Sequence, residues 1–99
     1  MRLGLPKWAQ VSPARLAHVE RVVALITTWA DALHLPSTER DRWLRAAWLH
    51  DALRDAPEDE LRRLVPDEPG PTELLHGPAA AVRAASDGEP DSGVLSAVR

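Results

Sequence analysis

Residues 46–55, AAWLHDALRD, form the stretch on which the fold depends. The stretch is apolar on all sides of a helical wheel, yet His50 and Asp51 lie side by side in its middle. A helix that is apolar all round belongs inside a core. Burying an imidazole beside a carboxylate costs free energy unless both groups are satisfied. The sequence therefore predicts a central helix over about 37–54, with the His50–Asp51 pair inside a cavity or at its edge.

A long helix is predicted before this central one. Ser12 and Pro13 make a favourable cap and first turn. Apolar residues then recur with helical spacing from Leu16 to Leu33. Pro36 ends the segment because proline cannot continue a helix.

Shorter helices are predicted elsewhere, and no strand-like alternation is found, so the predicted fold class is all-α. The remaining signals are a cap for the central helix at Ser37 or Thr38, a capping box from Asp55 to Glu58 before a short helix to about 65, a turn capped by Thr72, a helix from Gly77-Pro78 to about Ala85, a loop over 86–93 and the first turns of a further helix over 94–99.

Composition bounds the class of protein. A chain of 99 residues is expected to form one domain, over 12–99, after an N-terminal extension over 1–11. The net charge of −3 gives no reason to expect nucleic acid as a partner. No apolar run is long enough to span a membrane. The absence of cysteine excludes thiolate chemistry and agrees with a cytoplasmic location.

The His50–Asp51 pair is the strongest local sign of chemistry. Adjacent helical residues diverge by about 100°, but both side chains can reach one ion lying against the helix between them. A metal ion would neutralise the carboxylate and use the imidazole lone pair, which removes the burial cost. The alternative is a buried His–Asp hydrogen bond or a partly exposed pair.

Two further histidines are candidate ligands. His18 lies on the shoulder of the apolar stripe of the first helix, and His76 precedes Gly77 at a helix entrance. Imidazoles with a carboxylate suit Fe, Mn, Zn, Co or Ni better than Ca. Local sequence does not say that these residues converge. His34 is interpreted as a surface histidine near a helix end, where a cation suits the helix dipole.

Arg54 and Asp55 follow His50 and Asp51 by four residues, which on a continuous helix places each pair on one face. Arg54 could then reach a phosphate, and Asp55 could hold a water molecule or a leaving group. The alternatives are an exposed arginine and a plain helix cap.

Three segments together resemble one protein family. RLAH at 15–18, LHDALRD at 49–55 and LLHGPAAA at 74–81 resemble, in order and spacing, the HD-domain family of metal-dependent phosphohydrolases, and its YqeK-like branch in particular. VLSAVR at 94–99 resembles the segment that leads into a Tyr-His-Thr motif in that branch.

The resemblance implies an HD-domain-like helical bundle that hydrolyses diadenosine tetraphosphate symmetrically to ADP at a dinuclear, typically iron, centre, with manganese or another divalent ion possible. It implies that His18, His50 and Asp51 bind one metal and that Asp51 bridges to a second metal bound by His76. The implied roles are catalytic for Asp51, Arg54 and Asp55, and substrate-binding for Arg54 and Arg15. Arg54 stands where the family usually has lysine.

The resemblance also implies that the bundle is C-terminally incomplete, because the family's next histidine and late aspartate would fall beyond Arg99. The expectation is a fragment of a longer protein, with a naturally shortened relative as the alternative. Two other functions stay open: an HD-type hydrolase of another nucleotide, and a catalytically inactive helical interaction module, which could form a homodimer.

Overall fold

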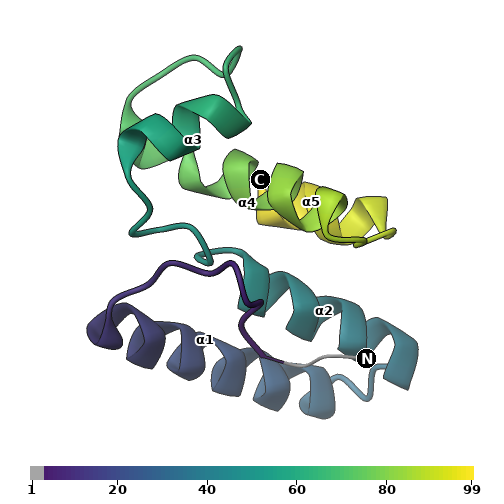
Figure 1. Ribbon diagram of the computed structural model, residues 1–99. Helices are drawn as coiled ribbons and strands as arrows, with labels where there is room; N and C mark the ends of the chain where they lie inside the picture. Colours follow the sequence, from purple (N-terminus) through teal and green to yellow (C-terminus); the bar gives the residue numbers. More distant parts are fainter. Residues whose placement is uncertain (1–3) are drawn as a thin grey trace.

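The computed structural model describes residues 4–99, and every regular element in that range is helical (Figure 1). The predicted all-α fold class is confirmed. The elements are α1 (Pro13–Ala32), α2 (Ser37–Leu49), α3 (Glu58–Leu64), the short 3-10 helix η1 (Thr72–Leu74), α4 (His76–Ser86) and α5 (Ser92–Val98).

The helices form two layers. The antiparallel pair α1 and α2 makes one layer, and α3, α4 and α5 make the other (Figure 1). Helix α2 is central, since it contacts α1, α4 and α5. The chain passes from one layer to the other through residues 50–56, which we call the site turn.

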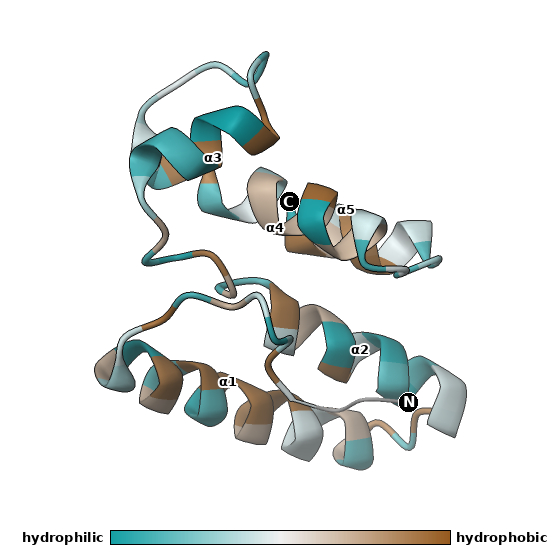
Figure 2. Ribbon diagram, viewed as in Figure 1, coloured by the Kyte–Doolittle hydropathy of each residue, from teal (hydrophilic) through white to brown (hydrophobic). Residues whose placement is uncertain are grey.

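The hydrophobic core lies mainly between the site turn and the second layer. Leu53, Leu61 and Leu75 are its largest fully buried side chains, with Val94 of α5 beside them. Alanines of α4 fill the space between helices and let them approach closely. Helix α3 contributes little beyond Leu61 and is largely hydrophilic (Figure 2).

Helix α1 begins and ends close to its predicted bounds. The Ser12 hydroxyl accepts a hydrogen bond of 3.1 Å from the Arg15 N–H, and Pro13 occupies the first turn. The helix stops at Ala32, ahead of Pro36. His34 lies just past this end with φ of +54°, a left-handed conformation that favours asparagine and glycine.

The central helix is shorter than predicted. It ends at Leu49, so the prediction that it continues to about Arg54 is wrong. The site turn uses hydrogen bonds from residue i to i+3 instead, as from the Ala52 N–H to the Leu49 carbonyl and from the Arg54 N–H to the Asp51 carbonyl, at 3.1 and 3.0 Å. Residues 50 and 54, and residues 51 and 55, therefore do not share a face of one helix as predicted.

Several predicted caps are also wrong. Pro36, Pro57 and Pro71 stand at the N-cap positions of α2, α3 and η1, and none of the three elements has a side-chain cap. Proline suits these positions because it has no N–H and holds an extended approach to the helix. The residues predicted as caps, Ser37 or Thr38, Asp55 and Thr72, do not act as caps.

The last two helices agree better with the sequence. Helix α4 extends over His76–Ser86, within one residue of the predicted segment. Helix α5 begins at Ser92, earlier than predicted, because the Asp91 carboxylate accepts hydrogen bonds from the Gly93 and Val94 N–H groups.

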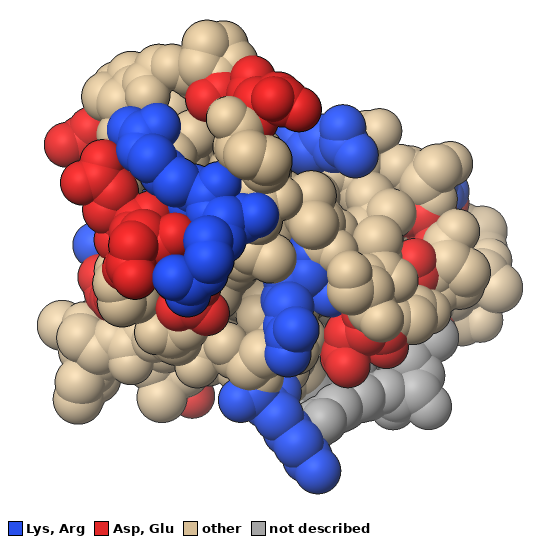
Figure 3. All heavy atoms as spheres, turned by 45° about the horizontal axis from the view of Figure 1, so that its top comes forward, with Lys and Arg blue, Asp and Glu red and all other residues tan. Residues whose placement is uncertain are grey.

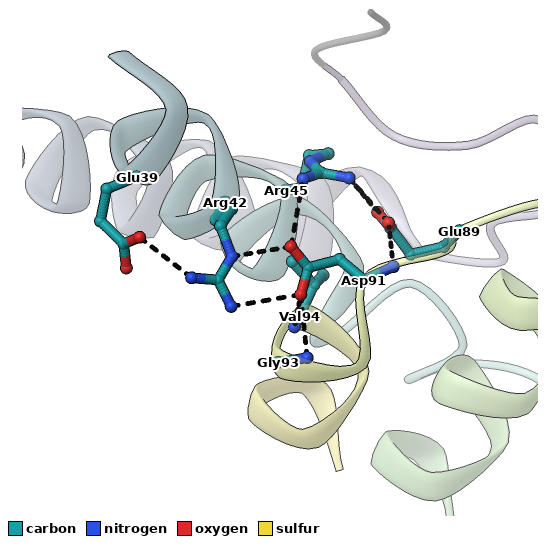
Figure 4. Close-up of polar contacts among 7 residues, drawn as sticks. All are labelled: Glu39, Arg42, Arg45, Glu89, Asp91, Gly93 and Val94. Atoms are coloured by element: carbon teal, nitrogen blue, oxygen red, sulfur yellow. Dashed lines mark hydrogen bonds and ion pairs between the residues drawn. The ribbon is translucent and has the colours of Figure 1, made fainter. Parts of the chain in front are cut away.

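An ion-pair network joins α5 to α2 (Figure 4). The Arg42 guanidinium donates to Asp91 at 2.7 Å and to Glu39 at 3.0 Å. Arg45 donates to Glu89 at 2.7 Å. The hydrogen bond from Arg42 lowers the pKa of Asp91, and the same contact, with that to Glu39, raises the pKa of Arg42.

On the face shown in Figure 3, acidic and basic side chains lie next to one another. Helix α3 carries two such pairs one turn apart, Arg62 with Glu58 and Arg63 with Asp59. Within residues 4–99, no helix combines the length and the apolar composition needed to cross a membrane.

Candidate metal centre

Asp51 lies in the site turn directly after α2. It is 5% exposed, and it is the one buried charged residue in the described range 4–99. A carboxylate taken out of water needs compensation by hydrogen-bond donors or by positive charge. The surroundings of Asp51 therefore decide what the site can hold.

Histidines from three elements face this carboxylate. The Nε2 atoms of His18 on α1 and His50 at the end of α2 lie 3.6 and 3.4 Å from Asp51 Oδ2. His76 Nε2, at the start of α4, lies 3.4 Å from Oδ1. The fold thus brings together all four residues predicted as metal ligands. Because His18 and His50 approach one oxygen and His76 the other, Asp51 stands between two half-sites.

Backbone carbonyls fix which nitrogen of two imidazoles carries the proton. His50 Nδ1 lies against the Ala47 carbonyl, and His76 Nδ1 lies 2.9 Å from the Glu73 carbonyl. A carbonyl oxygen only accepts, so each Nδ1 donates and, in the neutral ring, each Nε2 presents a lone pair toward Asp51. Histidines that bind metals commonly use their second nitrogen in this way.

Lone pairs facing a carboxylate repel it unless a cation lies between them. First-row divalent ions bind imidazole nitrogen and carboxylate oxygen at about 2.0–2.2 Å, so two donors on one ion lie up to about 4.4 Å apart. The contacts of 3.4 to 3.6 Å fall within that limit. The donor atoms of His18, His50 and Asp51 all lie within 4.8 Å of one another, close to that limit, so small side-chain rotations would bring them onto one ion. The residues fit a metal ion.

Arg54 reaches the edge of this cluster from the site turn. Its Nη1 atom lies 3.3 Å from His76 Nε2, to which it can donate. Arg54 was predicted to share a helical face with His50, but α2 ends at Leu49 and no continuous helix joins the two residues. The Asp51–Arg54 turn and the position of α4 bring it to His76 instead. Its predicted substrate-binding role is untested and stays a prediction.

Asp55 and Arg15 lie on the side of the site turn that meets the start of α1. The Asp55 carboxylate accepts a hydrogen bond of 2.9 Å from the Ser12 N–H and lies 3.9 Å from Arg15 Nε. Arg15 Nε is buried and makes no hydrogen bond within the residues that the structure describes. These contacts attach α1 to the site turn. The catalytic role of Asp55 and the substrate contact of Arg15 stay predictions.

A pocket of about 470 Å³ opens beside the cluster, between α1, α2 and α5. His50 forms part of its wall together with apolar side chains such as Ile26 and Trp43. Glu39 and Arg42 supply its charged part. His34 is exposed and takes no part in the cluster, in agreement with its interpretation as a surface residue.

Sequence reasoning missed the groups that orient the candidate ligands. The Ala47 and Glu73 carbonyls each lie three residues before the histidine that they contact. The short spacing is a usable signal once the helix end is known. The backbone contacts of Gln10 and Ser12 with the site turn involve partners more than forty residues away, and nothing local points to them.

The family model described as HD domain matches residues 15–99. The match contains all four candidate ligands, from His18 to His76. No curated protein and no solved structure matches the chain.

Proposed function

The chain belongs to the HD domain family, and from this premise we propose that it is a metal-dependent phosphohydrolase of the YqeK-like branch. Its proposed reaction is the symmetrical hydrolysis of diadenosine tetraphosphate to ADP. The observation that carries the proposal is the buried Asp51 carboxylate, which faces Nε2 atoms of three histidines at 3.4 to 3.6 Å. That arrangement calls for a cation.

The ligand assignment follows the two faces of the carboxylate. His18 and His50 would hold one ion together with Asp51 Oδ2, and His76 would hold a second ion together with Oδ1. All donors are nitrogen or oxygen, which suits Fe, Mn, Zn, Co or Ni, and the family resemblance favours iron, with manganese as the alternative. When bound, a metal pair supplies Lewis-acid activation of water and of a phosphoryl oxygen.

Arg54 would orient the substrate. Its guanidinium lies at the edge of the cluster, 3.3 Å from His76 Nε2, and its planar fork suits two oxygens of one phosphate. Because phosphoryl transfer depends mainly on positioning and charge stabilisation, removing this group should lower turnover without removing metal.

The chain has no cysteine, and we place the activity in the reducing cytoplasm.

Metal content tests the first part of the proposal. The protein, purified without chelator, is compared with His50→Ala and with His34→Asn, which changes an exposed histidine outside the cluster. We expect bound metal in the wild type and in His34→Asn, and none in His50→Ala. Equal metal in all three proteins would remove His50 from the site.

Product analysis tests the second part. Diadenosine tetraphosphate is supplied with Mn²⁺ or Fe²⁺, and nucleotides are separated by ion exchange. Symmetrical cleavage gives ADP alone, whereas asymmetrical cleavage gives ATP and AMP. Turnover of a nucleoside monophosphate or triphosphate, with diadenosine tetraphosphate left intact, would assign the chain to another nucleotide and contradict this part.

An interaction module is the second candidate function. Leu25 and Trp29 on α1, and Leu33 directly after it, are 48 to 60% exposed. The pocket of about 470 Å³ adds a largely apolar groove beside α1. Apolar surface of this kind is typical of sites that bind proteins. Absence of metal from the wild type together with a stable homodimer in light scattering would favour this function over hydrolysis.

A further inference from the structure

Residues 8–12, which we call the N-terminal strap, lie against the site turn. Gln10 is the centre of this contact. Its N–H donates to the Ala52 carbonyl at 2.7 Å, and its own carbonyl accepts from the Asp55 N–H at 3.1 Å. The two bonds bracket residues 52–55 immediately after Asp51.

These bonds replace those that a helix would supply. The site turn carries single i to i+3 hydrogen bonds and no continuous helical ladder. Asp51, Ala52 and Leu53 are nevertheless buried. A buried backbone carbonyl or N–H without a partner costs free energy, so the strap satisfies groups that the short α2 leaves open.

Both ends of the strap are anchored. Trp8 packs against the hydrophobic core. Its Nε1 lies 3.3 Å from the carboxylate of Asp87, the residue directly after α4, and the Arg83 guanidinium lies 5.9 Å from the centroid of its ring. At the other end, the Ser12 N–H donates to the Asp55 carboxylate at 2.9 Å. The Gln10 side chain adds a bond of 2.6 Å to Glu60 of α3.

The strap leads directly into α1, which carries His18. Ser12 caps that helix while its N–H binds Asp55. The strap thus joins the start of the helix that bears His18 to the turn that bears Asp51. The distance of 3.6 Å between His18 Nε2 and Asp51 Oδ2 depends on how these two segments meet.

We propose that the N-terminal strap is a positioning element for the metal site and that Gln10 is its positioning residue. The proposal rests on the proposed function, since it assumes that His18 and Asp51 bind metal. It concerns residues that precede the part of the chain matched by the HD domain family. Gln10 touches none of the candidate ligand side chains, so it acts only through the backbone of residues 52–55 and through Glu60.

Two kinds of variant test the proposal. Gln10→Pro removes the N–H that binds Ala52, and Val11→Pro is the matched control, because the Val11 N–H makes no hydrogen bond in the part of the chain described. Gln10→Glu sets two carboxylates against each other at residue 60. The double variant Gln10→Glu/Glu60→Gln restores the hydrogen bond with the donor now at residue 60 and the acceptor at residue 10. It therefore tests whether the bond itself rescues Mn²⁺ binding.

The measurement is the Mn²⁺ dissociation constant, from the electron paramagnetic resonance signal of free Mn²⁺, with metal-free Tm measured alongside. Groups that orient metal ligands typically contribute about 10–100-fold in affinity. We expect the Mn²⁺ dissociation constant of Gln10→Pro to rise about 10-fold or more, that of Gln10→Glu to rise in the same direction, and the double variant to return toward wild type. Val11→Pro should stay near wild type.

The outcomes separate the strap from the metal site. Mn²⁺ binding by the wild type, with unchanged affinity in both Gln10 variants, would overturn the strap and leave the proposed function standing. The strap would also be overturned if Gln10→Pro and Val11→Pro lost Mn²⁺ affinity to the same extent, each in proportion to its drop in metal-free Tm. No Mn²⁺ binding by wild type and by His50→Ala alike would overturn the proposed function and this inference with it. Weakened binding that Glu60→Gln rescues supports the strap.

Discussion

Replacing Asp51 by asparagine should make the metal-free protein more stable than wild type and should abolish the stabilisation that metal gives the wild type. The substitution keeps the size of the side chain and removes the charge of the one buried charged residue described within 4–99. Three imidazole nitrogens lie 3.4 to 3.6 Å from its oxygens, and the carbonyl contacts of His50 and His76 direct lone pairs rather than donors toward it. An unsatisfied buried group costs about 1–3 kcal/mol, and a charged one more.

The metal-free comparison gives the first half of the prediction. Without metal we expect Asp51→Asn to raise the free energy of unfolding by about 1–3 kcal/mol. For a domain of this size, each kcal/mol raises Tm by roughly 4–8 °C. The amide that this substitution introduces could also donate to an Nε2 lone pair, which adds to the gain.

The metal-loaded comparison gives the second half. An ion that binds only the folded wild type stabilises it by about 2.7 kcal/mol when its concentration is 100 times the dissociation constant. Asp51→Asn should lose this gain. Thermal unfolding followed by circular dichroism, in EDTA and in Mn²⁺, measures both, with His34→Asn as control. A metal-free Asp51→Asn protein less stable than wild type would show that the carboxylate is already satisfied and would refute the reasoning.

Three further predictions concern other parts of the fold. Gly77→Ala should lower the free energy of unfolding in urea by about 1–3 kcal/mol, since the new Cβ would lie 2.8 Å from the Val98 carbonyl oxygen; a gain of about 1 kcal/mol, the helix propensity of alanine, would contradict it. The Arg42 contact lowers the pKa of Asp91. The ionised Asp91 carboxylate therefore stabilises the folded protein fully above the ordinary aspartate pKa, and this stabilisation is lost as the pH falls through the lowered pKa. Below about pH 4, Asp91→Asn should therefore lose less stability than wild type in a pH series of urea titrations, and parallel losses would count against the contact. Arg54→Ala should keep the wild-type metal content and lower the rate of diadenosine tetraphosphate hydrolysis; an unchanged rate would remove Arg54 from the site.

Local signals predicted the helices well where the deciding contacts are local. The Ser12–Pro13 start of α1 depends on a cap and a first turn that lie next to each other in sequence. The end of α2, by contrast, does not depend on residues that are adjacent in sequence. Its apolar pattern continues past Leu49, but the Ala52 carbonyl and the Asp55 N–H bind Gln10. These backbone groups thus pair with a residue some forty positions away, and no local pattern reports that partner.

The residues of the candidate site also fall into two groups, those that local sequence could identify and those that only the tertiary structure brings together. His50 and Asp51 could be chosen from their own sequence context, because a charged pair in an apolar stretch is costly wherever it folds. The convergence of His18 and His76 on Asp51 is a tertiary fact, and only the ordered motifs of the family resemblance anticipated it. Arg54 was placed near the cluster by a helical argument that the structure overturns.

The short length of helix α5 makes it a candidate for local unfolding. Its seven residues are too few to persist as an isolated helix in water, since nucleation is unfavourable. It stays folded through Asp91 at its start and through Val94 and Val98 in the core, and its end lies close against Gly77 of α4. Loss of the Asp91 contacts should therefore favour local opening of α5 as a unit. Gly77, which the end of α5 covers, follows His76 directly. The rate of amide hydrogen exchange in α5 would therefore report how often the backbone next to His76 becomes exposed to solvent.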